Sequence, residues 1–453
     1  MNLKKRWISI LALILVLVAV ILVGASIINT GDGETIISRN KKDTITLWYT
    51  DEALTDYLLS KAVDFNESHD DVRIEMELVS GLEYLENINK ASISDDETTP
   101  DLFIVTNDSL EKAYLAGLAS EITDTSLMDE SGIFSDTAKN AVTYNGKYVG
   151  YPFSFETAAL LYNKTYLDNI ASEAEITDSS SLVPESILDI LTFADLYSAP
   201  ENVEYFLKWD VSDIFYNYFF IGNYITVGGE SGDNEEEINI YSTESIASMM
   251  VYQELNQFFS IDADDTNYDS IMQEFIDGKI IYTIATSDCI ATLEENDFAY
   301  EYGVASLPSI NSDLLTKGMS VTNALVVNGY SLHKDEANEF ISYLYSQDTD
   351  SQLYALSGKM PAWKQTTYTN EACEQFYNNY LVSTPIPKMV KTSNFWIELE
   401  ACFARVWSGE DANTEMKTIS EQIKSQISGE AYTEEQLQSP EVEILEVEES
   451  VEE

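Results

Sequence analysis

Histidine, cysteine and basic residues are scarce in this sequence, and each shortage excludes a class of function. His69 and His333 are the two histidines among 453 residues, so a histidine-based zinc site or a Ser-His-Asp triad has almost no material. The 24 Lys and Arg residues stand against 79 Asp and Glu residues, which gives a formal net charge of −55. Nucleic acids and anionic lipids require a basic patch. We therefore expect no nucleic-acid partner. We also expect no metal, no cofactor and no catalysis. The alternative interpretation of the acidity is that it only maintains solubility.

The three cysteines, Cys289, Cys373 and Cys402, are too far apart in the sequence for a metal-binding motif. Their odd number means that they cannot all pair within the chain. One disulfide between Cys373 and Cys402 and a set of buried free thiols both remain open.

The N-terminus carries the longest uncharged run. Three basic residues at positions 4–6 precede residues 7–28, which as a helix would span about 30 Å of hydrocarbon. This order of charge predicts that the N-terminus stays inside and that the remainder is exported. We expect residues 1–28 to form a signal anchor, that is, a transmembrane helix, or a cleaved signal peptide. The body then lies outside the cytoplasm, anchored to the cell membrane or secreted.

Strand-like and helix-like segments alternate through the first part of the body. This alternation predicts a parallel α/β architecture, in which ligands lie beyond the carboxyl ends of the strands. The loops after Trp48 and Val105 are therefore candidate ligand loops. The predicted strands are 44–49, 72–79 and 102–105, later joined by 279–284 and 323–327; the predicted helices are 53–66, 82–91, 242–259, 269–276, 334–345, 394–407 and 412–427.

Four ordered segments resemble a known family. They are Thr46-Leu47-Trp48-Tyr49 with Asp51; Pro100-Asp101-Leu102-Phe103-Ile104; residues 144–152 with Glu156 and Leu161-Tyr162-Asn163-Lys164; and Phe275-Ile276-Asp277-Gly278-Lys279 with 303–308. Their order and spacing over about residues 43–428 resemble the maltose-binding-protein-like branch of the extracellular solute-binding proteins (family 1). Each segment alone is a weak signal, but together they make chance similarity improbable.

The resemblance implies a two-lobed α/β fold of the periplasmic-binding-protein type (type II) with a hinged cleft. Crossing segments are expected near 155–158 and 319–323, where a few residues absorb the rotation that closes the lobes. The predicted division is a spacer over 29–43, lobe 1 over 43–155 plus 322–370, lobe 2 over 156–321 plus 371–428, and an acidic disordered tail over 429–453.

The function implied by the resemblance is that of the substrate-binding component of an ABC importer. Such a protein captures a mono- or oligosaccharide by hinge closure and delivers it to permease subunits in the membrane, and we expect it to act as a monomer. A sensing or adhesion protein on the same fold is the main alternative. An acid-pair carbohydrate-active enzyme is a further alternative, but no diagnostic pair of carboxylates stands out.

Carboxylates and aromatic rings are the expected ligand-binding residues, because a sugar offers hydroxyl groups and an apolar ring face. Glu156 lies in the closest motif match, and Trp396 matches a stacking position of the family. For each acid the alternative is a solvated surface charge, and for each ring it is core packing. The predicted carboxylates are Asp51, Asp108 and Glu156, and the predicted aromatic residues are Trp396, Trp48, Tyr49, Tyr216 and Tyr218.

Two segments depart from the family pattern. After the strand at 279–284 the chain continues Ala285-Thr286-Ser287-Asp288, where the family commonly has Gly and a stacking Trp. The strand after Pro100 ends in Val105-Thr106-Asn107-Asp108, also without a Trp. The loss of two aromatic platforms predicts a more polar pocket and leaves the identity of the sugar open.

Overall fold

Two long strands, β6 (Tyr151–Asn163) and β12 (Met319–Val327), organise the fold because they take part in both of its halves. The computed structural model describes residues 42–94, 99–263, 266–296 and 298–442, and from Asp43 onward the chain forms one compact unit. The main sheet has the strand order β2-β1-β3-β12-β6-β10-β7. We refer to the half on the β2 side as lobe 1 and to the half on the β7 side as lobe 2.

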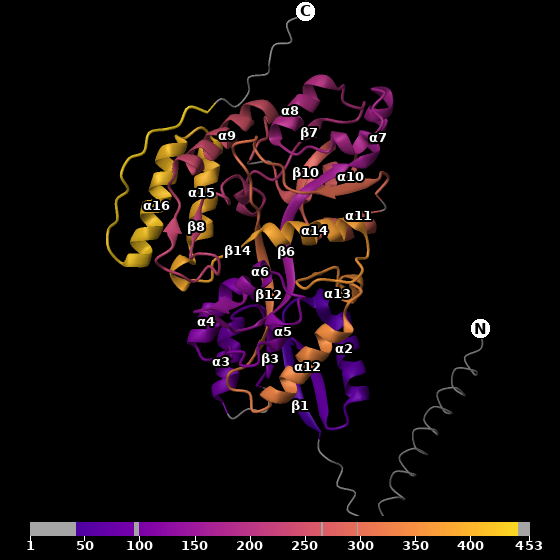
Figure 1. Cartoon of the computed structure of the whole chain (residues 1–453), viewed down its shortest axis with the longest axis vertical. Helices are drawn as coiled ribbons and strands as arrows, with labels where there is room; N and C mark the ends of the chain where they lie inside the picture. Colours follow the sequence, from indigo (N-terminus) through magenta and orange to yellow (C-terminus); the bar gives the residue numbers. More distant parts are fainter. Residues whose placement is uncertain (1–41, 95–98, 264–265, 297, 443–453) are drawn as a thin grey trace, which may run out of the picture. The chain divides into compact units, whose positions relative to one another are not determined.

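Lobe 1 contains the strands β1 (Asp43–Tyr49), β2 (Val72–Leu78) and β3 (Leu102–Thr106), with β12 beside β3. β1 is parallel to both β2 and β3, whereas β12 is antiparallel to β3. Its helices lie around this sheet in the lower part of Figure 1. They are α2 (Thr55–Ser68), α3 (Tyr84–Ile93), α4 (Leu110–Leu115), α5 (Ser126–Asp129), α6 (Asp136–Ala141), α12 (Lys334–Gln347) and α13 (Gln352–Ser357).

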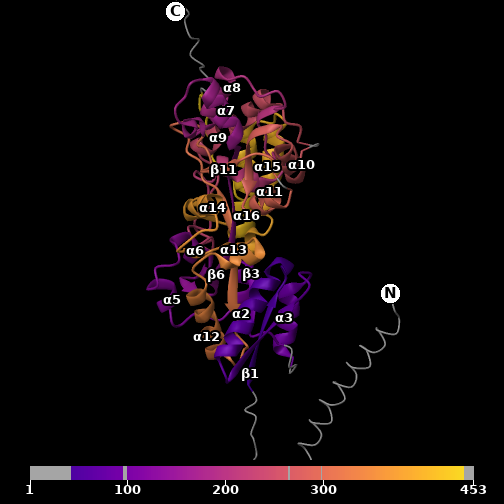
Figure 2. The same ribbon diagram turned by 90° about the vertical axis from the view of Figure 1, so that its right-hand side faces the viewer.

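Lobe 2 contains β7 (Tyr205–Leu207), β10 (Ile280–Thr286) and β11 (Tyr302–Ala305), which are joined to the end of β6. Figure 1 shows β7 and β10, and Figure 2, turned by 90°, shows β11, all above the lobe 1 strands. The helices of this half are α7 (Lys164–Glu173), α8 (Ile187–Leu196), α9 (Thr243–Phe259), α10 (Tyr268–Ile276), α11 (Cys289–Glu295), α14 (Glu371–Val382), α15 (Phe395–Trp407) and α16 (Ala412–Ser428).

Short strands complete the chain. β4 (Thr143–Tyr144) and β5 (Lys147–Tyr148) form a hairpin, and β8 (Thr226–Val227) pairs with β9 (Ile238–Asn239). β13 (Met360–Pro361) pairs with β6, and β14 (Thr384–Pro385) pairs with β12.

The strand β6 changes partner in its middle. It pairs with β12 through Thr157 and with β10 from Ala158 onward. The Thr157 hydroxyl donates to the Met319 carbonyl at 2.8 Å, which ties the two long strands together where β6 leaves one half for the other. This change of partner lies within the predicted crossing segment at 155–158.

Two buried apolar clusters form the core, and they meet around β6. The second cluster fills lobe 2, whereas the first fills lobe 1 and continues through α14 to α10 and α11. Phe155 of β6 stacks on Tyr380 of α14, with ring centroids 4.0 Å apart and an interplanar angle of 7°. The core therefore supports β6 from behind, on the side toward which Phe155 points.

All three cysteines are free and buried, which agrees with the thiol interpretation. Burial raises the pKa of the Cys373 thiol to about 11 and that of Cys402 to about 12, so both thiols stay protonated and unreactive at neutral pH.

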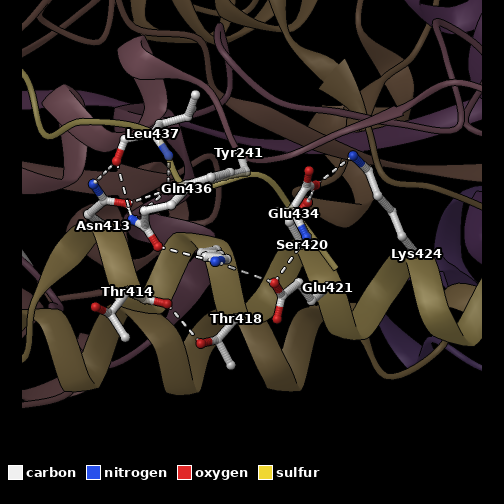
Figure 3. Close-up of polar contacts among 11 residues, drawn as sticks. Tyr241, Asn413, Thr414, Thr418, Ser420, Glu421, Lys424, Glu434, Gln436 and Leu437 are labelled. Carbon is white, nitrogen blue, oxygen red and sulfur yellow. Dashed lines mark hydrogen bonds and ion pairs between the residues drawn. The ribbon is translucent and has the colours of Figure 1, made fainter. Parts of the chain in front are cut away.

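The part of the C-terminal tail that the structure describes lies along α16, where the sequence alone predicts disorder. Glu434 accepts from the Lys424 ammonium and from the Ser420 hydroxyl, both at 2.6 Å (Figure 3). Leu437 packs against the lobe 2 core, and the Asn413 amide donates to its carbonyl at 3.0 Å. The acidic composition concealed these contacts because one carboxylate, two apolar residues and a few amides provide them.

The predicted fold included an N-terminal transmembrane helix, and this part of the prediction is corrected here. In the part of the chain that the structure describes, no helix combines the length and the apolar character needed to cross a membrane. The predicted segment, residues 7–28, lies outside the described residues. The longest described helices, α9 and α16, have 17 residues each, and both carry polar faces. The supported fold is therefore the two-lobed α/β fold, and no described residue supports the predicted transmembrane helix.

Candidate ligand-binding cleft

Glu156 is the exposed residue in an otherwise buried stretch of β6. Successive side chains of a strand point to opposite faces, so Glu156 points away from its buried neighbours Phe155 and Thr157. Among the described residues, none forms a hydrogen bond or an ion pair with its carboxylate. Solvent reaches the side chain, but protein surrounds it on several sides. This crowding raises the pKa of Glu156, and nearby Asp288 raises it further, whereas Lys359 acts in the opposite direction.

A cavity of about 380 Å³ opens at Glu156. Its wall combines two carboxylates, the hydroxyl groups of Thr286 and Tyr216, and several aromatic and aliphatic side chains. This mixture of a few polar groups on an apolar wall is typical of small-molecule sites. The lining residues are Glu156, Asp213, Ile214, Phe215, Tyr216, Thr286, Met319, Val321, Ile386 and Trp396.

The aromatic part of the wall comes from two separate elements of lobe 2. Trp396 lies in the first turn of α15, next to Phe395, which is buried in the core, so the helical rotation turns the indole toward the cavity. Its ring meets the edge of Tyr218 with centroids 5.8 Å apart. Tyr216 stacks on Tyr268 at 4.7 Å and 16°. Both platforms are thus held by a second ring behind them.

The polar part of the wall includes Glu156, Asp213 and Thr286. Asp213 accepts from the Phe215 backbone amide at 2.8 Å and so begins the short 3₁₀ helix Ile214–Tyr216. Burial raises the pKa of Asp213, while that same hydrogen bond lowers it. Asp288, just beyond the lining, accepts from the Tyr268 hydroxyl at 3.1 Å and from the Thr286 hydroxyl. Carboxylate oxygens therefore remain available to accept further hydrogen bonds.

A second cavity, of about 360 Å³, lies on the lobe 1 side, and Asp51 and Asn323 are among its lining residues. Here two of the three carboxylates in the lining, Asp51 and Glu86, are paired with lysines. Asp51 accepts from the Ala53 amide at 3.0 Å and forms an ion pair with Lys359 at 2.9 Å. The Glu86 and Lys112 side chains in the same lining form another ion pair. Asp51 and Lys359 both act electrostatically on Glu156, so the two cavities belong to one region between the lobes.

The predicted ligand residues lie at the Glu156 cavity, on the lobe 1 side of the cleft, or in the lobe 1 core. Glu156, Tyr216 and Trp396 line one cavity, and Tyr218 is buried directly behind Trp396. Asp51 lines the lobe 1 cavity, whereas Asp108 is exposed beyond the end of β3 and accepts from the Thr106 hydroxyl.

The two aromatic residues of the first strand, Trp48 and Tyr49, lie in the lobe 1 core and line neither cavity. The Trp48 indole donates to Glu77 at 2.8 Å, and the Tyr49 hydroxyl donates to Thr55 at 3.1 Å. Both are buried because β1 is an inner strand between β2 and β3, with helices over the sheet.

Several residues of the cleft were not among the predicted ones, namely Asp213, Thr286, Asp288 and Lys359. Asp288 follows strand β10 directly, and a polar residue at the carboxyl end of a strand was a signal that could have identified it. Asp213 and Lys359 gave no such signal, because their positions depend on how distant segments meet.

One group of described residues could offer ligands to a metal ion: Asp43, His333 and Glu336, whose ligand atoms lie within 4.8 Å of one another. They belong to the start of β1 and of α12, whereas the cleft lies beyond the ends of β1 and β3. This group therefore lies outside the cleft.

Two α/β lobes, crossed by shared strands and enclosing a polar and aromatic cleft, define the class of two-lobed solute receptors. Residues 61–375 match the family model described as bacterial extracellular solute-binding protein. The chain belongs to this family, and the resemblance predicted from the sequence is confirmed. The family description agrees with a body located outside the cytoplasm.

The individual relatives share little sequence identity with this chain. The maltotriose-binding protein of Pyrococcus abyssi is 27% identical over 230 residues, which cover 51% of this chain and 46% of that protein. A maltooligosaccharide ABC transporter solute-binding lipoprotein of Streptococcus pneumoniae is 22% identical over 83% of this chain and 88% of its own.

Solved structures show the same fold. The extracellular solute-binding protein of Staphylococcus aureus, in complex with maltose, has a TM-score of 0.71 at 20% identity and covers 86% of this chain and 98% of its own. A cyclo/maltodextrin-binding protein in complex with maltotetraose has a TM-score of 0.70 at 20% identity, with the same coverage.

Proposed function

We propose that this protein is the substrate-binding component of an ABC importer and that it captures a carbohydrate in the cleft at Glu156. The observation that supports this most is that Glu156 and Trp396, from β6 and α15, line one cavity. A carboxylate accepts sugar hydroxyl groups, and an indole covers the apolar face of the sugar ring. The names of the relatives, which refer to maltotriose and to maltooligosaccharides, support the same class of ligand.

Capture works through closure of the lobes about β6 and β12. A ligand held by Glu156 and Trp396 that also contacts the lobe 1 cavity favours the closed state by the extra contacts it makes there. The change of partner between Thr157 and Ala158 supports the division into 43–155 plus 322–370 and 156–321 plus 371–428. Helix α14 packs against both β6 and α6, so it lies at the junction of the two lobes.

Delivery to permease subunits, without chemical change of the sugar, completes the proposed role. The family consists of solute-binding proteins, and the cleft combines acceptors and stacking rings. Incubating the protein with its ligand and analysing the products tests this directly. Recovery of intact sugar is the expected result, and any hydrolysis contradicts it.

A thermal-shift screen against mono- and oligosaccharides tests the ligand class. A sugar present at 100 times its dissociation constant raises the free energy of unfolding by about 2.7 kcal/mol. Glu156→Ala, with an affinity at least about tenfold weaker, should reduce the shift by the same sugar to about half or less. If no sugar raises the melting temperature while peptides or polyamines do, the carbohydrate proposal is wrong.

A further inference from the structure

The cavity at Glu156 contains more negative charge than the described protein neutralises. Three carboxylates lie together here: Glu156 and Asp213 in the lining and Asp288 beside Thr286. Among the described residues, none of the three forms an ion pair, and the lining contains no Lys, Arg or His. This contrasts with the lobe 1 cavity, where Asp51 and Glu86 each contact a lysine.

The lysine that acts on Glu156 does not compensate for this charge. Lys359 is close enough to lower the pKa of Glu156, but Asp288 and Asp51 both raise it, and burial raises it most. The Lys359 ammonium lies 2.9 Å from an Asp51 oxygen, so lobe 1 already provides its counterion. The remaining negative charge at Glu156 therefore favours a ligand that brings its own positive charge.

The aromatic wall suits the same kind of ligand. An ammonium group is attracted to the face of an indole or phenol ring, and the attraction grows where water is partly excluded. Trp396 and Tyr216 both line the cavity and are braced by Tyr218 and Tyr268. The same rings can cover the apolar face of a pyranose, so one wall serves both parts of an aminated sugar.

We propose that the ligand is an amine-bearing carbohydrate, whose ammonium group binds among Glu156, Asp213 and Asp288 and whose ring face lies on Trp396. This inference rests on the proposed carbohydrate-binding function and specifies its substrate class. A neutral sugar offers hydroxyl donors to the same oxygens, but it leaves the negative charge uncompensated.

Matched saccharides test the inference. Titration calorimetry of the protein compares glucosamine and its β-1,4-linked oligomers with their N-acetylated counterparts and with maltooligosaccharides. We expect the free amines to bind at least about tenfold more tightly than the N-acetyl forms at low salt, with a smaller ratio at 0.5 M salt, because charge attraction is screened. Tighter or equal binding of neutral or N-acetylated sugars overturns this inference and leaves the carbohydrate function standing. Binding of neither kind of saccharide overturns both.

Variants test which carboxylate binds the ammonium group of the ligand. Glu156→Gln keeps the size and the acceptor oxygen but removes the charge, so the ratio of amine to N-acetyl affinity should fall by about tenfold while neutral sugars are less affected. Glu67→Gln, at an exposed position of α2 outside both linings, is the matched control and should leave the ratio unchanged. Melting temperatures of both variants verify folding. An unchanged ratio in folded Glu156→Gln contradicts the proposed ammonium position.

Discussion

Two ionisable groups lie where the lobes meet, and their surroundings are opposite. Lys388 is fully buried, and its ammonium donates to the Asn140 carbonyl at 3.0 Å and to the Ser231 carbonyl. Asn140 belongs to the α6 region of lobe 1, and Ser231 to the β8–β9 loop of lobe 2. Glu156 is exposed, and no described residue offers it a hydrogen bond or an ion pair.

This difference suggests different roles: Lys388 makes a structural contact, whereas Glu156 is placed to bind a ligand. A buried charge whose hydrogen bonds are made by carbonyl groups fixes the elements around it, because removing one partner leaves others unsatisfied. A carboxylate left with free acceptor oxygens in a cavity is available to a ligand. We therefore expect changes at Lys388 to alter stability and changes at Glu156 and Trp396 to alter binding.

The largest effect should come from the pH dependence of Lys388. Burial lowers the pKa of Lys388 from 10.5 to about 8, with Asp233 and Glu111 opposing the shift. Because the unfolded chain keeps this proton up to a higher pH, the penalty for the buried charge is fully present below pH 8 and disappears as pH rises to about 10.5. Relative to Lys388→Met, the wild-type free energy of unfolding should rise by roughly 3 kcal/mol across this window.

Urea unfolding of both proteins at a series of pH values measures this difference. Tyrosines and other groups titrate alike in the two proteins, so their contributions cancel. A difference that stays constant between pH 8 and 10.5 would show that Lys388 is not held as a buried cation.

Trp396→Ala should weaken ligand binding by about 2 kcal/mol, or roughly thirtyfold, because it removes a half-buried aromatic platform of the cavity. Trp48→Phe is the matched control. Trp48 is buried in lobe 1 and bound to Glu77, so its replacement should lower the melting temperature and leave affinity unchanged. Loss of affinity in the control alone would place the platform on β1 instead.

Glu156→Gln should lower affinity by about 1.5 kcal/mol, the range of a hydrogen bond to a charged group. The ligand-free variant should melt no lower than the wild type, because the raised pKa of Glu156 means that the charged form is disfavoured in the folded state. That cost is present at neutral pH and is lost as the pH falls through the raised pKa. Protonation of Glu156 on acidification should weaken ligand binding by the wild type. Because its pKa is raised, this decline should begin at a higher pH than it would for an ordinary carboxyl group. A marked drop in the variant's melting temperature would indicate a structural role.

The smallest effect is expected at Lys359. Its ion pair with Asp51 is about two-fifths exposed on both sides, at 41% and 42%, and exposed pairs contribute less than about 1 kcal/mol. Lys359→Met should hardly change the melting temperature but should strengthen binding of amine-bearing sugars slightly, since it removes a nearby positive charge. Weaker binding of such sugars would mean that Lys359 contacts the ligand itself.

Much of the fold was predictable from the sequence because short patterns carry it. The alternation of strands and helices in the first part of the chain and the ordered motifs identified the two-lobed class. Helix α8 was missed inside an acidic, Ser-rich stretch, although Ile187, Ile190 and Phe193 recur at helical spacing and Ser186 with Asp189 forms a capping box. Composition averaged over the stretch obscured that pattern.

The site was predictable where a motif fixed the local geometry and not elsewhere. Glu156 and Trp396 were placed by their neighbours along the chain. Asp213 and Lys359 reach the cleft through the meeting of distant segments, which no local pattern records. Trp48 and Tyr49 were both predicted to bind the ligand, but an inner strand covered on both faces buries both.

The most direct test of the account is calorimetric titration of wild type and Glu156→Ala with the saccharide that stabilises the protein most in the thermal-shift screen. The account predicts saturable one-to-one binding by the wild type and affinity at least tenfold weaker for a variant that melts at or above the wild-type temperature. Equal affinity of the two proteins for that saccharide would contradict it.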